Sequence, residues 1–221
     1  MKQQWKPGTM IYPLPAVLVS CGETPASYNL LTVAWTGTVC SDPPMCYVSI
    51  RPERHSYAII RRTGAFVINL TTEAMARATD WCGVRSGRDC DKWSETGLTP
   101  VPASTVAAPL VGEAPVSIEC RVRQVIPLGS HDMFLAEVTA VQVDERYIDP
   151  ATGKFRLEDA GLLVYSHGEY FSVGKLLGYF GWSVRRRKVI AREKKGGTAS
   201  HPAKPAAKPR KTGKPSVSDG K

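Results

Sequence analysis

The residues best able to bind a ligand gather where a strand-like run gives way to a helix-like run, in VSIRPERHSYAII (residues 48–60). Arginine offers a fork of N–H donors that suits a phosphate, and hydroxyl and backbone N–H groups at a helix start add further donors. This pattern favours the binding of an anion, although a set of surface ion pairs explains it equally well in isolation. The residues concerned are Ser49, Arg51, Arg54, His55 and Ser56.

Two other polar clusters could contribute to the same kind of site. In residues 29–40, polar side chains interrupt a run that otherwise reads as a buried strand; exposure at a sheet edge is the alternative explanation. In SGRDCDKW (residues 86–93), Gly87 allows a tight turn around which cations could close over an anion, and a solvated loop is the alternative. The clusters comprise Asn29, Thr32, Trp35 and Thr36, and Ser86, Arg88, Asp89 and Lys92.

A lone histidine, His131 in GSHD, opens a predicted strand after a tight turn. Such a histidine is usually structural or solvated, and a functional one would lie against a cofactor ring or a substrate. The sequence has neither a nucleophile with a base and an orienting group nor paired carboxylates in an apolar setting, so hydrolysis is disfavoured. No GxGxxG motif follows a strand, so a Rossmann dinucleotide site has no support either.

Length and composition bound the class of protein. The 221 residues are 43% hydrophobic, which is enough for one sizeable core or one domain with a tail. No apolar stretch approaches the roughly 20 residues needed to span a bilayer, and the first residues lack a signal-peptide layout. The six cysteines form no CxxC motif, so we expect reduced thiols in a cytoplasmic protein without structural zinc.

The charge is divided unequally along the chain. Residues 185–221 carry thirteen Lys/Arg and two acidic residues, a net charge of +11. Residues 1–184 carry sixteen basic and eighteen acidic residues, a net charge of −2, so the overall +9 says nothing about nucleic-acid binding by the fold. The Pro/Ala/Lys-rich tail is expected to be disordered from about residue 191. A solvated extension is favoured over a loose contact with nucleic acid.

Strands and short helices must position these clusters. Two long strands joined at Gly129–Ser130 predict an antiparallel hairpin, and the first of them alternates apolar and polar residues. Many strands and few helices favour an antiparallel barrel over a doubly wound sheet. Strands are expected over residues 16–22, 29–40, 45–50, 65–70, 115–129 and 131–145, with a last short pair over 161–174. Helices are expected over residues 55–64, ending at Gly64, and 71–83, capped by Thr72 and ending at Gly83.

Five segments carry a resemblance to a known family when they are taken in order. They are NLLTVAWTGTVCSDPPMCYVSIRPERHSYAIIRRTGAFVINL, WCGVRSGRDCDKW, APLVGEAPVSIECRV, GSHDMFLAEV and GEYFSVGKLLGYFGWS. Over roughly residues 12–184 the chain resembles the flavin reductase-like, FMN-binding split-barrel proteins, and their flavoredoxin branch most closely. The resemblance implies a mainly β fold for residues 1–184, a six-stranded antiparallel Greek-key split barrel with a few short helices, followed by the basic tail.

The resemblance also implies noncovalently bound FMN near the interface of a homodimer. Residues 29–36 would line the isoalloxazine ring, the strand end after Ser49 would surround the phosphate, and residues 86–92 would close over the cofactor, while Arg54 is expected to face water. His131 would lie near the flavin, although its Ser-His-Asp context departs from the Gly-Asp-His order of other branches. The implied cofactor residues are Asn29, Leu30, Thr32, Val33, Ala34, Trp35, Thr36, Ser49, Ile50, Arg51, His55, Ser56, Ser86, Gly87, Asp89 and Lys92, with His131 as the implied catalytic residue.

Two functions follow from the resemblance. One is an FMN-dependent oxidoreductase that passes electrons from NAD(P)H to flavin, ferric complexes or another acceptor. The other is a flavoredoxin-type electron carrier that exchanges electrons with a protein partner and has no small-molecule turnover of its own. The cluster of donors at one strand end suits the FMN phosphate, which carries close to two negative charges at neutral pH. The lack of a prominent acid or base fits chemistry that the flavin itself carries.

Overall fold

The computed structural model describes residues 1–184. The chain divides into two units, Met1–Gly174 and Lys175–Lys221, and the described part of the second contains a 3₁₀ helix, η5 (Trp182–Val184). The basic tail, residues 185–221, lies outside the described residues, and so does the disorder expected from about residue 191. Within residues 1–184, no helix is both long and apolar enough to cross a membrane.

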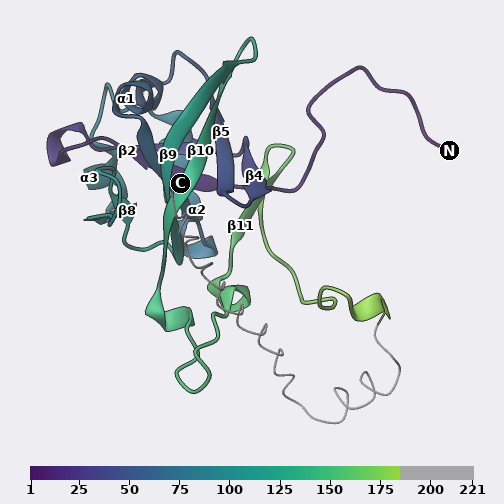
Figure 1. The fold of residues 1–221 in the computed structure, drawn as a ribbon. Helices are drawn as coiled ribbons and strands as arrows, with labels where there is room; N and C mark the ends of the chain where they lie inside the picture. The colour runs from purple at the N-terminus through teal and green to yellow at the C-terminus, as the bar shows by residue number, and fades with distance from the viewer. Residues whose placement is uncertain (185–221) are drawn as a thin grey trace, which may run out of the picture. The chain divides into compact units, whose positions relative to one another are not determined.

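An antiparallel sheet dominates the first unit, as the strand-rich sequence predicts (Figure 1). Its strand order is β3-β2-β6-β9-β10-β5-β4, and every neighbouring pair is antiparallel. The predicted hairpin of two long strands is confirmed as β9 and β10. The strands are β2 (Val17–Cys21), β3 (Asn29–Val33), β4 (Thr36–Ser41), β5 (Pro44–Ile50), β6 (Ala65–Leu70), β9 (Val116–Pro127) and β10 (Asp132–Val143).

The segment predicted as one strand over residues 29–40 is two strands, and the break between them marks the split of the barrel. β3 and β4 lie at the two opposite edges of the sheet, although only Ala34 and Trp35 separate them. Because three peptide steps span at most about 11 Å, the two edges must approach each other and the sheet must curl. The Trp35 carbonyl accepts a hydrogen bond from Ser49 N–H (2.8 Å), which ties the connection to β5. The result is a split barrel of seven strands, one more than expected.

The inside of the curled sheet holds the main apolar core. Phe66 and Phe134 are fully buried there among valine and isoleucine side chains of neighbouring strands. In the first half of β9 the polar residues of the alternating pattern are buried as well, namely Ser117 and Glu119. Residues 104–111 cover that face, and Ser104 and Thr105 both donate hydrogen bonds to the Glu119 carboxylate.

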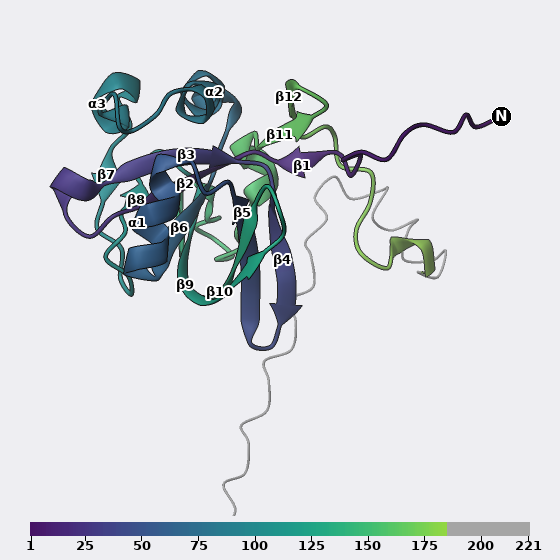
Figure 2. The ribbon, with the colours of Figure 1, turned by 90° about the horizontal axis from the view of Figure 1, so that it is seen from above.

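Three helices lie against the sheet. The first, α1 (His55–Thr63), ends at Gly64 (φ +66°) as predicted, because glycine adopts the left-handed conformation without strain. The second predicted helix is a 3₁₀ turn, η2 (Glu73–Met75), followed by α2 (Ala76–Val84); Gly83 lies inside α2 instead of ending it, and Thr72 makes no side-chain cap. The third, α3 (Lys92–Thr96), and α2 cover one face of β2 and β3 over a second apolar cluster (Figure 2).

A separate three-stranded sheet joins β1 (Leu14–Pro15) to the predicted last strand pair, β11 (Leu163–Ser166) and β12 (Glu169–Ser172). His167 (φ +50°) and Gly168 (φ +92°) form the two-residue connection, and two positive φ angles are typical of a type I′ hairpin turn. The remaining elements are η1 (Pro25–Ser27), β7 (Pro100–Val101), β8 (Leu110–Val111), η3 (Glu145–Tyr147) and η4 (Leu157–Ala160).

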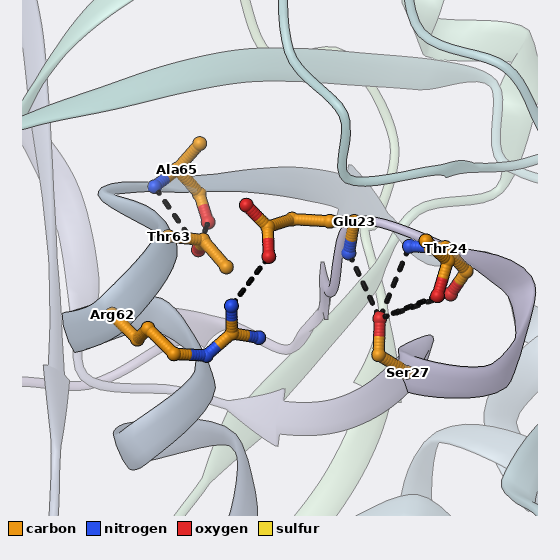
Figure 3. Close-up of polar contacts among 6 residues, drawn as sticks. All are labelled: Glu23, Thr24, Ser27, Arg62, Thr63 and Ala65. Atoms are coloured by element: carbon orange, nitrogen blue, oxygen red, sulfur yellow. Dashed lines mark hydrogen bonds and ion pairs between the residues drawn. The ribbon is translucent and has the colours of Figure 1, made fainter.

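The connection between β2 and β3 is anchored to the end of α1 (Figure 3). Glu23 forms an ion pair with Arg62 of α1. Ser27 Oγ accepts hydrogen bonds from Glu23 N–H (3.0 Å) and Thr24 N–H (3.1 Å), which fixes the turn that leads into β3. These contacts set the start of β3 relative to α1, the two elements that carry Asn29 and Ser56.

Candidate functional site

A cavity of about 460 Å³ lies at the split of the barrel. The end of β3, the connection to β4 and the end of β5 contribute one part of its lining, and α2 with the β11–β12 hairpin contributes another. This first cavity is lined by Ala16, Leu31, Thr32, Val33, Ala34, Trp35, Ser49, Ile50, Arg51, Arg54, Asp80, Gly83, Val84, His131, Tyr165, Gly168 and Tyr170.

A second cavity of about 400 Å³ continues from the first, because Leu31, Arg51 and Arg54 line both. Five basic residues and one carboxylate line it, so its potential favours an anion. It brings together residues of all three predicted polar clusters. Its lining consists of Asn29, Leu31, Arg51, Glu53, Arg54, His55, Ser56, Arg85, Ser86, Gly87, Arg88 and Lys92.

Lys92 is the most informative residue of the second cavity, because it is a buried cation, only 3% exposed. Its ammonium donates to the carbonyl oxygens of Leu30 (2.9 Å) and Cys82 (2.6 Å), and no ion pair joins it to a carboxylate within residues 1–184. An ammonium has three N–H donors, so these two carbonyls leave one for a ligand. Burial lowers the pKa of Lys92, and a bound anion would offset that cost of burying a charge.

A close approach of backbone to side chain shapes the same cavity. Asn29 Nδ2 donates to Ser56 Oγ (2.7 Å), which links the start of β3 to the first turn of α1. A Cβ added to Gly87 would lie 2.1 Å from Asn29 Oδ1, so the loop can reach this position only with glycine. Arg54, at the N-cap of α1, makes no side-chain cap, and the first-turn N–H groups of a helix have no acceptor within the helix. The N-terminal end of α1 therefore adds donors and a favourable dipole to the cavity.

The arginines of residues 48–60 have different roles. Arg51 is half exposed and pairs with Glu53 (3.4 Å). Arg54 is exposed, as expected, and it also lines both cavities and donates to the Gly83 carbonyl (3.1 Å), which joins α1 to α2. Burial lowers the pKa of His55, and the charges of Arg88 and Lys92 add to that effect, so His55 is neutral at pH 7.

Two aromatic rings meet at the first cavity. The Trp35 and His131 rings are stacked, with centroids 6.5 Å apart and planes inclined by 16°. His131 Nδ1 lies 2.9 Å from Ser130 Oγ, and this contact orients the ring. Burial lowers the pKa of His131, with the nearby Arg51 as a further cause, so the imidazole is neutral at pH 7. Together the Trp35 and His131 rings form a flat, mostly apolar part of the lining.

Some predicted residues do not reach either cavity. Leu30 points into the second apolar cluster, because successive residues of a strand face opposite sides, and its neighbour Leu31 lines both cavities instead. Thr36 is buried and donates to the Tyr47 carbonyl (2.7 Å), which holds β4 to β5. Asp89 lies in the 86–92 loop but is not among the lining residues.

Part of the lining was not predicted from the sequence. Asp80 and Val84 of α2 and Tyr165 and Tyr170 of the hairpin all face the first cavity. Tyr170 hydrogen-bonds to Asp80 across 90 positions of sequence, and no local motif signals such a pairing. Neither α2 nor the β11–β12 hairpin contains a residue of the predicted clusters, so nothing in the sequence indicates that they line the cavity.

Replacing Gly87 with alanine is expected to destabilise the protein by about 1–3 kcal/mol, the usual cost of overpacking. The new Cβ would displace the Asn29 side chain, which is buried and held by Ser56. Thermal unfolding followed by circular dichroism measures the effect. Gly174→Ala is the matched control, because a Cβ at Gly174 meets open space. Equal unfolding temperatures for the two variants would contradict the tight approach at Gly87.

Comparisons with known proteins identify what this chain is similar to. The flavin reductase like domain matches residues 9–174. The flavoredoxin of Desulfovibrio vulgaris (Miyazaki F) is 33% identical with a TM-score of 0.77, over 84% of this chain and 100% of that one. The flavoredoxin from Methanosarcina acetivorans is 25% identical with a TM-score of 0.74, over the same shares. A protein of Aeropyrum pernix is 31% identical over 157 residues, 71% of this chain; the matched part spans 58% of that relative's length.

Proposed function

Because the chain belongs to the flavin reductase-like domain family, we propose that it binds FMN and passes electrons through it from NAD(P)H to a flavin, a ferric complex or another acceptor. The observation that carries the proposal is the pair of joined cavities, one with a buried lysine that has no carboxylate partner among residues 1–184 and one with stacked aromatic rings. A ligand that joins a phosphate to a flat ring system would match both cavities. The similarity to flavoredoxins supports FMN as that ligand.

The residues present fit FMN. Lys92, Ser56 and Arg51 would hold the phosphate together with the N-terminal end of α1, and the close approach of Gly87 to Asn29 would shape the cradle. Residues 32–35 and 49–50 would lie along the isoalloxazine, and Trp35 would shield it from water. Bound FMN supplies the redox chemistry, and the protein fixes its orientation and surroundings.

Of the residues that line the first cavity, His131 would be the one best suited to hold a proton beside the ligand. Its ring is fixed by Ser130 and by stacking on Trp35, and its lowered pKa keeps it neutral near pH 7. A neutral imidazole can donate or accept one hydrogen bond at Nε2, according to its tautomer, without placing a charge beside the ring system. In this proposal it hydrogen-bonds to the ligand at the split and does not act as a nucleophile.

The purified protein is expected to be yellow, and its absorbance is expected to bleach under anaerobic conditions on addition of NADH or NADPH. Spectra recorded after each nicotinamide, with dithionite as the control for full reduction, make the measurement. A colourless protein that does not take up added FMN would contradict the proposed function. Retention of FMN that dithionite but neither nicotinamide reduces would favour the second candidate, an electron carrier served by a protein partner, which the 33% identity to a flavoredoxin supports.

The same proposal includes a homodimer in the cytoplasm, which the family resemblance and the cysteine pattern support. Analytical ultracentrifugation tests the dimer, and a single species of monomer mass would contradict it.

The basic tail is proposed to play no part in cofactor binding. A chain shortened by residues 191–221 that no longer binds FMN would contradict that assignment.

A further inference from the structure

The part of the first cavity that comes from α2 and the hairpin carries a group of residues for which FMN has no evident use. We propose that Asp80, Tyr165 and Tyr170, here called the Asp–Tyr wall, bind the ring of the second substrate: an uncharged, flat heterocyclic ring that bears an amide or imide N–H donor. This inference rests on the proposed function, because it assumes that the rest of the two cavities holds FMN.

The distribution of charge separates the Asp–Tyr wall from the phosphate end. Asp80 is the one carboxylate among the residues that line the first cavity, whereas Arg51 and Arg54 mark the end that it shares with the second cavity. A phosphate is attracted to the arginines and repelled by Asp80. FMN is thereby fixed with its phosphate away from the wall, which leaves the wall to another molecule.

The hydrogen bonding of Asp80 defines what it can bind. The Tyr170 hydroxyl donates to Asp80 Oδ1 (3.2 Å), and within residues 1–184 no hydrogen bond or ion pair involves Oδ2. An ionised carboxylate is an acceptor only, so its available oxygen selects an N–H or O–H donor and rejects an anion. Burial and the Asp80 charge raise the pKa of Tyr170 to about 12, so the tyrosine stays a donor at neutral pH.

The tyrosine rings select for a flat partner. Tyr165 and Tyr170 meet edge to face with centroids 5.7 Å apart, and Tyr165 makes a second edge contact with Tyr12 (6.1 Å). They lie directly opposite each other in the β11–β12 register, and the type I′ turn beside them places Gly168 in the cavity lining. Paired rings on a tight hairpin lose little freedom on binding and offer faces and edges to an aromatic ligand.

Two molecules present this shared chemistry. The nicotinamide ring carries a carboxamide N–H₂, and the isoalloxazine of a free flavin carries an imide N–H. Anionic acceptors such as ferric citrate lack such a donor and are disfavoured by Asp80. The wall thus favours an organic ring over a metal complex as the molecule that exchanges electrons at the site.

The test uses the full-length holoprotein with Asp80→Asn and Tyr170→Phe, and Asp42→Asn at the exposed β4–β5 turn as the matched loss of one charge. FMN affinity is measured first by fluorescence quenching. Anaerobic reduction by NADH and by NADPH is then followed in stopped flow over a range of concentrations, and reoxidation of the reduced protein by riboflavin is followed in the same way.

We expect FMN affinity to stay within about twofold in all three variants, since the wall is assigned to another ligand. The half-saturating concentration of one ring ligand is expected to rise about three- to tenfold in Asp80→Asn and Tyr170→Phe, the loss of one hydrogen bond, and to stay unchanged in Asp42→Asn. A rise in the half-saturating concentration of NADH or NADPH identifies the ring as nicotinamide, and a rise in that of riboflavin identifies it as flavin.

Three results overturn the inference. If the variants bind FMN normally and their half-saturating concentrations of NADH, NADPH and riboflavin are all unchanged, the wall does not bind the substrate. The same conclusion follows if the wild-type protein binds FMN but is saturated by none of the three ligands. Weaker FMN binding in Asp80→Asn assigns the wall to the cofactor. A wild-type protein that binds no FMN is a different failure, because it overturns the proposed function itself.

Discussion

Replacing Lys92 with methionine is expected to weaken FMN binding about ten- to a hundredfold and to leave riboflavin binding nearly unchanged. Lys92 is buried with two carbonyl partners and, in the part of the chain that the structure describes, no carboxylate partner, so its charge is available to a phosphate. A charge-assisted hydrogen bond contributes about 1.5–3 kcal/mol, which corresponds to that range of affinity. Riboflavin has the same ring system without the phosphate, so it reports whether the rest of the site is intact.

The measurement is flavin fluorescence quenching by the apoprotein, at a temperature well below unfolding. That precaution is needed because methionine leaves the carbonyls of Leu30 and Cys82 without their donor, at a cost of about 1–3 kcal/mol for each buried group. Lys154→Met is the control: Lys154 is partly exposed and pairs only with Glu158 in the described part of the chain. Equal weakening of FMN and riboflavin would mean that the fold of the site has changed. Unchanged affinity for both would place the phosphate elsewhere.

Replacing Glu119 with glutamine is expected to lower the free energy of unfolding at neutral pH by about 3 kcal/mol. Its carboxylate is fully buried and accepts five hydrogen bonds, two from Ser104, two from Thr105 and one from Gln142. Burial alone would raise the pKa of Glu119, but the hydrogen bonds outweigh it and lower the pKa to about 2. A fall of the pKa from the ordinary value of 4.5 for a glutamate corresponds to roughly 3 kcal/mol of stability.

The sign of the pH dependence follows from that lowered pKa. The folded protein holds Glu119 ionised more readily than the unfolded chain does, so this stability is present above about pH 4.5 and is lost as the pH falls toward 2. Urea unfolding at a series of pH values should show a steeper acid loss in the wild type than in Glu119→Gln. Glu137→Gln on β10 is the control, because Glu137 belongs to a partly exposed ion pair with Arg123, which is worth at most about 1 kcal/mol. Parallel pH profiles for the wild type and Glu119→Gln would contradict the prediction.

Local pattern was enough to predict much of the fold. β6 and α1 were predicted within one residue of their observed bounds, because a run of β-branched and aromatic residues and a helix ending at Gly64 are decided by neighbours in sequence. The β9–β10 hairpin was predicted for the same reason. The donor cluster of residues 48–60 also lies together in space, since a strand end and the helix that follows it are adjacent in the chain.

Several features of the site depended on contacts that no local pattern contains. The break at Ala34–Trp35 could not be predicted, because no glycine or proline marks it and only the curling of the sheet places β3 and β4 at opposite edges. The burial of Glu119 depends on residues 104–111 folding back over β9, and its partners come from two other segments. The alternation of polar and apolar residues along β9 does not show that its polar residues form a buried network.

The sequence by itself determined the type of fold, the positions of most elements and the fact that cationic and hydroxyl side chains gather at one strand end, because periodicity, turn residues and chain adjacency act over a few residues. Only the tertiary structure decided that Lys92 is a buried cation, that Leu31 and not Leu30 faces the cavities, and that Asp80 meets Tyr170. These outcomes depend on how the sheet curls and which segments cover it. Burial and pairing across long separations are properties of the packed chain.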